Sequence, residues 1–147
     1  MTEQLSPLAL QALAVVKESG AIIGANHAHP HTIRHKGRID LVTETDIAVE
    51  AFLKERLATL APQAGFLAEE SAEDLSLPDT CWIIDPVDGT TNFAHGLPLT
   101  VTSVAYRLNG EIVLGIVNAP LLRECFIAEK GKGAWRNGER ISVSSVT

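Results

Sequence analysis

The sequence has few of the features that mark secreted, membrane-spanning or nucleic-acid-binding chains. Its two cysteines, Cys81 and Cys125, form no C-x-x-C pair, which favours two buried structural thiols in a reducing cytoplasm. No basic stretch precedes an apolar core at the N-terminus, so a secretory signal is not indicated. The longest apolar run, residues 8–16, is too short to span a membrane. The net charge of -6 argues against nucleic acid as the main partner.

Patterns that would indicate other kinds of site are also missing. The glycine-rich residues 130–133 lack the spacing and the terminal Lys-Ser/Thr of a phosphate-binding loop. Zinc is disfavoured because no His or Cys pair stands at ligand spacing. No repeat or internal linker is found, and 46% hydrophobic with 20% charged residues is typical of one globular domain.

Helices are expected in the first part of the chain. Ser6 and Pro7 are typical of an N-cap and a first helical position, so they predict a helix over residues 8–23 that Gly24 would end. This helix is apolar almost all round, and we expect it to need cover on more than one side. The alternating histidines of residues 27–31 resemble a metal-binding tract, but a solvated loop is favoured because they fix no ligand geometry.

A second helix is predicted to begin near Thr43. Thr43 and Asp46 resemble a capping box, and the apolar face that follows runs to about Leu60, before Pro62. Asp46 is then either an acid favoured by the helix dipole or a functional carboxylate, and the residues alone leave both open.

The rest of the chain is predicted to be mostly strands. Asn-Gly turns at residues 109–110 and 137–138 predict hairpins. The expected strands cover residues 65–68, 82–84, 101–108, 112–118, 124–129, 134–136 and 141–143. The predicted fold class is α+β, with two N-terminal helices packed on a mostly antiparallel sheet.

Two of the apolar strands end in acids, which indicates a metal site. Glu69 follows the strand at residues 65–68, whereas Asp85 and Asp88 end the next one. Burying such carboxylates together is costly unless a cation neutralises them. With oxygen ligands only, magnesium is the natural choice, and manganese or calcium could substitute.

The residues after these acids suit a phosphate. Pro86 restricts the turn, and Gly89 allows a ligand to approach the backbone closely. Thr90 and Thr91 at a helix start can offer amides and hydroxyls to an anion.

Several segments together resemble the inositol monophosphatase family, which belongs to the magnesium-dependent, lithium-sensitive phosphatases. They are Glu69-Glu70-Ser71, residues 82–95, the Asp-Leu-Val-Thr-x-x-Asp of residues 40–46, and residues 131–144. The resemblance covers nearly the whole chain in family order. Residues 91–95 favour the inositol monophosphatase branch over bisphosphate nucleotidases and fructose bisphosphatases, which share the metal motif.

The resemblance implies a role for each matching residue. Glu69, Asp85 and the carbonyl of Val87 would hold one metal, and Asp85 with Asp88 would hold a second. Glu70 and Ser71 would belong to the water network, and Thr90 with Asp46 would orient and deprotonate the attacking water. The backbone amides of Gly89 and Thr90 would bind the phosphate, and Asp88 would contact the alcohol. Lys36 would lie at the mouth of the site. The implied reaction is in-line hydrolysis of a phosphorylated inositol or similar polyol or sugar by metal-activated water.

The resemblance also implies that residues 1–147 are the single N-terminal metal- and phosphate-binding domain of a longer enzyme, the N-terminal half of a layered sugar-phosphatase-type fold. Family members continue with a second half that carries a further metal ligand and the residues that select the substrate. Weak or absent hydrolysis is therefore expected of this chain. An exposed apolar face is expected as well, which favours a homodimer or aggregation. The alternatives are a non-catalytic metal-binding or interaction module of the same fold, a bisphosphate nucleotidase and a fructose bisphosphatase.

Overall fold

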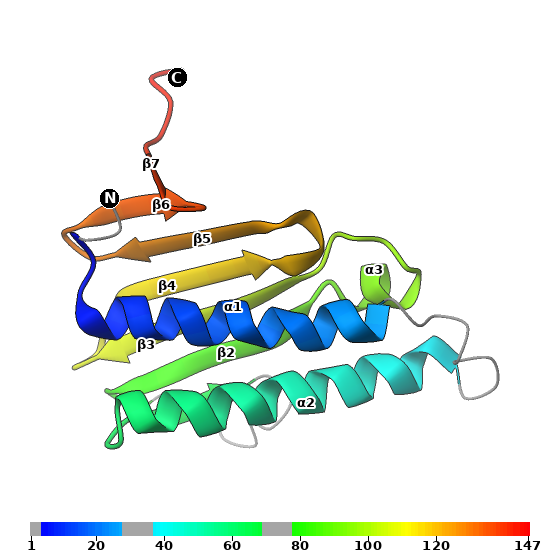
Figure 1. The fold of residues 1–147 in the computed structure, drawn as a ribbon. Coiled ribbons are helices and arrows are strands. Elements are labelled where there is room, and N and C mark those ends of the chain that lie inside the picture. Colours follow the sequence, from blue (N-terminus) through cyan, green and yellow to red (C-terminus); the bar gives the residue numbers. More distant parts are fainter. Residues whose placement is uncertain (1–3, 28–36, 69–77) are drawn as a thin grey trace.

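The structure is a computed structural model that describes residues 4–27, 37–68 and 78–147, without the side chains of 37–41. Two long helices lie against one face of a seven-stranded sheet (Figure 1). The helices are α1 (Pro7–His27), α2 (Gly37–Leu60), α3 (Thr90–Ala94) and the 3-10 helix η4 (Pro120–Leu122). The strands are β1 (Gly65–Ala68), β2 (Cys81–Asp88), β3 (Val101–Leu108), β4 (Glu111–Ala119), β5 (Glu124–Glu129), β6 (Gly133–Arg136) and β7 (Glu139–Ile141).

The strands lie in the sheet in the same order as in the sequence. Within the described residues, only β1 and β2 pair in parallel, and every other neighbouring pair is antiparallel. The predicted α+β class with a mostly antiparallel sheet is therefore confirmed.

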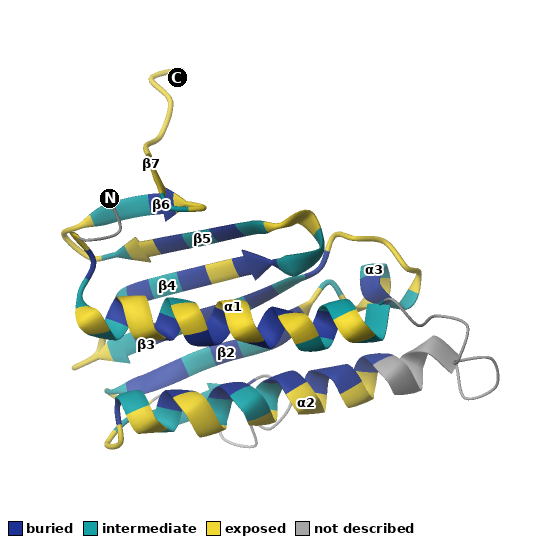
Figure 2. Cartoon of the chain, in the orientation of Figure 1, coloured by how far each residue is buried: buried dark blue, intermediate teal, exposed yellow. Residues whose placement is uncertain are grey.

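The core lies between the sheet and the two long helices. Alternate residues of the central strands face the helices and are buried, as the alternating colours along β2 to β5 show (Figure 2). Trp82 and Trp135 are the largest fully buried side chains, and the Trp82 ring lies 4.4 Å from that of Tyr106. Burial of one such aromatic side chain contributes about 1.5–3 kcal/mol.

Helix α1 begins as predicted but continues past its predicted end. The Ser6 hydroxyl accepts a hydrogen bond from the Ala9 amide (3.1 Å) and donates one to Glu129 (2.5 Å), so this N-cap also joins α1 to β5. Gly24 does not end the helix, which runs on to His27. The prediction of a solvated loop is therefore wrong at His27, while His29 and His31 lie outside the described residues.

Helix α1 is long and apolar enough to cross a membrane by length and composition. In this fold many of its apolar residues pack against other elements, which cover the helix on two sides. One side packs on β3, β4, β5 and η4, and the other side packs on α2. The expectation that this helix needs cover on more than one side is confirmed.

Helix α2 begins at Gly37, before the predicted start near Thr43. The capping-box prediction is therefore wrong, because Thr43 and Asp46 lie inside the helix. Buried positions recur every three or four residues from Val42 through Thr45 to Val49, which continues the helical face toward the N-terminus. The predicted end at Leu60 is confirmed.

Both Asn-Gly hairpins form as predicted. Asn109 and Gly110 have φ angles of 51° and 83°, and Asn137 and Gly138 have 49° and 83°. Positive φ at both central residues defines the primed turn that matches the twist of paired strands. The last strand, β7, has the predicted length but begins two residues earlier than predicted. Residues after Ile141 project from the body of the protein, and Val143 is 96% exposed (Figure 1).

The sheet face turned away from the helices carries an exposed apolar surface. Val117 and Ile141 are 38% and 40% exposed, and they line a shallow depression of about 260 Å³ together with Phe126 and Ala134. The expected apolar face therefore lies on the sheet and not around α1. Association of the chain through this face remains a prediction.

The two glycines of α1 provide a test of this packing. A Cβ on Gly20 would lie 2.9 Å from the Pro120 Cβ, whereas one on Gly24 would meet nothing within 4 Å. We expect Gly20→Ala to lower the free energy of unfolding by about 1–3 kcal/mol, because η4 would have to move. Gly24→Ala should raise it by about 0.5–1 kcal/mol through helix propensity. Urea denaturation measures both, and the same sign for the two variants would contradict the packing of α1 on η4.

Candidate functional site

The predicted acids lie at the end of β2, where the strand is irregular. Asp85 pairs with Ser103 and Asp88 with Val101, so three steps along β2 oppose two along β3. This is a β-bulge, which bends a strand and redirects its side chains. Asp85 is half-buried and Asp88 is exposed, whereas Val87 between them is buried. The two carboxylates therefore lie on either side of a kink that exposes their end of the strand.

A threonine of the neighbouring strand holds this bulge. The Thr102 hydroxyl is fully buried and donates a 2.9 Å hydrogen bond to the carbonyl oxygen of Pro86. Because the strand is irregular there, that carbonyl needs a partner outside the regular ladder. Thr102 thus positions both acids. The sequence does not reveal this role, since the contact depends on the register of two strands.

The turn after Asp88 requires a glycine. Gly89 has a φ angle of 91°, and a Cβ there would lie 2.7 Å from the carbonyl oxygen of Leu99. The same carbonyl accepts a 2.9 Å hydrogen bond from the Asn92 side chain. Gly89 is the N-cap of α3, and its carbonyl accepts the first helical bond from Phe93. The predicted helix start at Thr90 is therefore confirmed, and the exposed Thr90 begins it.

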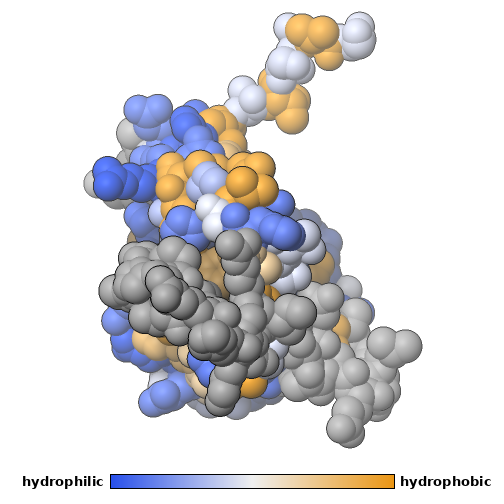
Figure 3. Space-filling view, turned by 90° about the vertical axis from the view of Figure 1, so that its right-hand side faces the viewer, coloured by the Kyte–Doolittle hydropathy of each residue, from blue (hydrophilic) through white to orange (hydrophobic). Residues whose placement is uncertain are grey.

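The ends of both long helices meet this turn. Asp46 is buried in α2, which packs against both β2 and α3. Next to it, Thr45 accepts a 2.7 Å hydrogen bond from Asn26 of α1. His27 lies 3.1 Å through its Nε2 from the carbonyl oxygen of Gly96, beyond α3. Figure 3 looks onto this end of the molecule, where both hydrophilic and hydrophobic atoms of described residues reach the surface.

Four predicted site residues lie outside the described residues: Glu69, Glu70, Ser71 and Lys36. β1 pairs in parallel with β2 up to Ala68, which lies opposite Ile84, the residue before Asp85. Within the described residues, no three His, Cys, Asp or Glu side chains lie close enough to share a metal ion. The predicted proximity of Glu69 to Asp85 therefore remains a prediction.

The cysteines lie apart from these acids. Cys81 and Cys125 are free and buried, as predicted. Burial raises the pKa of both thiols. The positive charges of Arg107 near Cys81 and of Lys17 near Cys125 lower the pKa of each thiol by a smaller amount. Both thiols are therefore protonated at neutral pH and are poor nucleophiles.

The fold and the acidic strand end define a class: α+β proteins with two helices packed on one face of a mostly antiparallel sheet that presents carboxylates beside a short helix. Comparison with known proteins narrows this class. The model of the inositol monophosphatase family matches residues 4–147. The chain belongs to the inositol monophosphatase family.

Individual relatives agree with this assignment. The chain is 48% identical over 139 residues to an inositol monophosphatase of Dictyostelium discoideum. The aligned region covers 92% of this chain and 51% of the relative. A solved structure of the SuhB protein of Bartonella henselae has a TM-score of 0.81 and 33% identity, with 96% of this chain and 55% of that chain covered. An IMPase of Thermotoga maritima has a TM-score of 0.76 and 37% identity, with 90% and 52% covered. The chain thus spans about half the length of the relatives that it matches.

Two threonines at the start of β3 test the role of the bulge contact. Thr102 and Thr100 are both fully buried, but the Thr100 hydroxyl has no hydrogen-bond partner among the described residues. We expect Thr102→Val to lower the free energy of unfolding by about 1–3 kcal/mol, because the Pro86 carbonyl loses its partner. Thr100→Val should be neutral or stabilising. Denaturant unfolding compares the two, and equal losses would show that the Thr102 hydrogen bond does not hold the bulge.

Proposed function

We propose that this chain is the metal- and phosphate-binding domain of a magnesium-dependent phosphomonoesterase that hydrolyses inositol monophosphate or a similar polyol or sugar phosphate. The bulge between Asp85 and Asp88 is the observation that carries this proposal. It presents two carboxylates at one strand end, directly before the backbone amides that begin α3. A cation and a phosphate can then be bound side by side.

The donor set fits magnesium. Carboxylate oxygens of Asp85 and Asp88 and the carbonyl oxygen of Val87 are hard ligands, which magnesium prefers over sulfur or imidazole. When bound, the metal would supply Lewis acidity that neutralises charge on the phosphate. Glu69 would add a further carboxylate. The support for this role is that Ala68, the residue before Glu69 in the sequence, pairs with Ile84, the residue before Asp85.

The protein groups around the metal would bind the phosphate and move a proton. The backbone amides of Gly89 and Thr90 lie at the start of α3, where no intrahelical carbonyl can pair with them. They would bind phosphate oxygens, and Asp88 would contact the alcohol. Thr90 would orient the attacking water through its hydroxyl, and Asp46 in the adjacent helix would accept the proton.

The residues outside the described part would complete this arrangement. Glu70 and Ser71 would hold the water network, and Lys36 would lie at the mouth of the site. Because the chain spans about half of its relatives, we propose that full activity needs residues from their other half. The free, buried thiols are consistent with work in a reducing cytoplasm.

Two other functions are favoured by particular relatives. A Thermotoga maritima protein that is 47% identical over 105 residues is named fructose-1,6-bisphosphatase/inositol-1-monophosphatase, which supports a sugar bisphosphate as an alternative substrate. A Salmonella typhimurium protein that is 35% identical over 144 residues is named Nus factor SuhB, which supports an interaction module of the same fold.

Magnesium binding tests the central claim. We expect calorimetric titration to show saturable binding to the wild-type chain. Asp85→Asn removes the charge of a direct metal ligand. Loss of a residue that only supports a ligand typically lowers metal affinity by roughly 10–100-fold, so we expect this variant to lower magnesium affinity by more than that. Asp79→Asn is the matched control, since Asp79 is exposed and precedes the opposite end of β2. Unchanged binding in Asp85→Asn would remove the proposed metal site.

Turnover separates the enzymatic functions. With magnesium present, the 147-residue chain should release phosphate weakly or not at all from inositol monophosphate, fructose bisphosphate and a nucleotide bisphosphate. The physical reason is that one metal held by this half alone cannot stabilise both the attacking and the leaving oxygen. Phosphate release is measured with each substrate in parallel and with Asp85→Asn as the blank. Robust release by the wild-type chain would contradict the need for a second half.

A further inference from the structure

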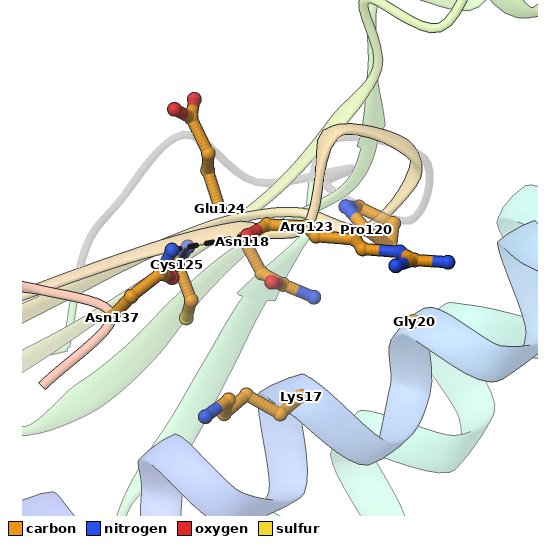
Figure 4. A pocket seen from close by; sticks show the side chains of 8 residues that line it. All are labelled: Lys17, Gly20, Asn118, Pro120, Arg123, Glu124, Cys125 and Asn137. Atoms are coloured by element: carbon orange, nitrogen blue, oxygen red, sulfur yellow. Dashed lines mark hydrogen bonds between the residues drawn. The ribbon is translucent and has the colours of Figure 1, made fainter.

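A cavity lined by several charged and polar side chains lies between α1 and the connection from β4 to β5. Its volume is about 410 Å³, which is ample for a small molecule. Lys17 and Gly20 line it from α1, Asn118 and Pro120 from the end of β4 and η4, and Arg123 and Asn137 from the turns beside β5 (Figure 4). None of these residues belongs to the proposed active site.

The cavity has two cations without carboxylate partners. Within the part of the chain that the structure describes, neither Lys17 nor Arg123 takes part in an ion pair or a side-chain hydrogen bond. Glu124 also lines the cavity, but its carboxylate is bound to Arg136, and it points away from Lys17 and Asn118 (Figure 4). In a chain with a net charge of -6, two uncompensated cations around one cavity favour an anion.

A buried amide also faces this space. Asn118 is only 6% exposed, yet its side chain has no hydrogen-bond partner among the described residues. Figure 4 shows its amide pointing from the sheet toward α1, between Lys17 and Gly20. Because Asn118 lines the cavity, its amide can donate to an acceptor bound there.

The cavity wall is built with little freedom to move. A Cβ on Gly20 would lie 3.0 Å from the Asn118 Nδ2, so a larger residue would displace the amide. Asn137 donates a 3.1 Å hydrogen bond to the carbonyl oxygen of Arg123 and accepts one from the Cys125 amide (2.9 Å). These bonds fix the backbone of Arg123 in its left-handed conformation, with a φ angle of 56°.

We propose that this cavity binds a phosphate group, with Lys17 and Arg123 neutralising its charge and the Asn118 amide donating to one of its oxygens. Two cations match the double negative charge of phosphate, whereas a carboxylate carries one charge. The site is separate from the proposed active site and does not depend on the proposed function. Its ligand is either free phosphate or a small phosphate ester.

The test is an NMR titration of the ¹⁵N-labelled 147-residue chain in the presence of a chelator. Without magnesium, the acidic end of β2 repels phosphate, so binding reports on the cavity. Inorganic phosphate, glycerol phosphate and acetate are titrated separately. We expect saturable shifts of the Asn118 side-chain amide with one or both phosphate compounds, and binding by acetate at least about tenfold weaker. Tighter binding of glycerol phosphate would identify an ester as the ligand, and tighter binding of inorganic phosphate would identify the free ion.

Three variants make the test specific. Lys17→Gln and Arg123→Asn each remove one charge, and Asn tolerates the left-handed backbone at position 123. Each should weaken binding by about tenfold, because a charged hydrogen bond is lost. Lys132→Gln removes an exposed lysine that pairs with Glu129, and it should change affinity less than about twofold.

Two outcomes would overturn the proposal. One is equal binding by the wild type, Lys17→Gln and Arg123→Asn. The other is a set of shifts that avoids Asn118 and follows exposed lysines without saturation. Shifts of the Gly89 and Thr90 backbone amides would report on the proposed active site and shifts of the Asn118 side-chain amide on the cavity, so failure of one can be told apart from failure of the other.

Discussion

The hydrogen bond from Thr102 to the Pro86 carbonyl is the contact on which the site depends. It fixes the extra residue of β2, and that residue decides the directions of Asp85 and Asp88. Proline has no amide to donate and restricts the residue before it, so the kink cannot relax into a regular ladder. A buried hydroxyl thus sets the positions of two exposed or half-exposed acids, although it touches neither of them.

The layer of helices supports the same end of the sheet. Asn26 joins the last turn of α1 to Thr45 of α2, and the next residue is the buried Asp46. His27 reaches the carbonyl oxygen of Gly96 beyond α3. The turn after β2 is therefore held by contacts from both helices. Packing and hydrogen bonds therefore connect the segments that carry Asp85 and Asp88, the amides at the start of α3 and the buried Asp46.

Local signals in the sequence predicted local structure well. The Asn109-Gly110 turn and the Ser6 cap are determined by a few adjacent residues, and both form as predicted. The start of α2 was wrong because a Thr-x-x-Asp pattern occurs inside helices as well as at their ends, and the buried face around Thr45 decides between them. The position of Asp85 and Asp88 at the end of an apolar strand could be predicted from sequence order, and their role as metal ligands remains a prediction. The role of Thr102 could not be predicted, because it depends on the pairing of β3 with β2 and not on the residues next to Thr102 in the sequence.

The strand order has a consequence for how the chain folds. From β2 to β7 each strand pairs with the next strand in sequence, so most of the sheet closes short loops that lose little chain entropy. The bond between Ser6 and Glu129 is different, since it spans 123 residues. We therefore expect the meander to form early and the N-terminal helix to dock late. The half-buried cap of α1 would then be the last part of the native structure to form.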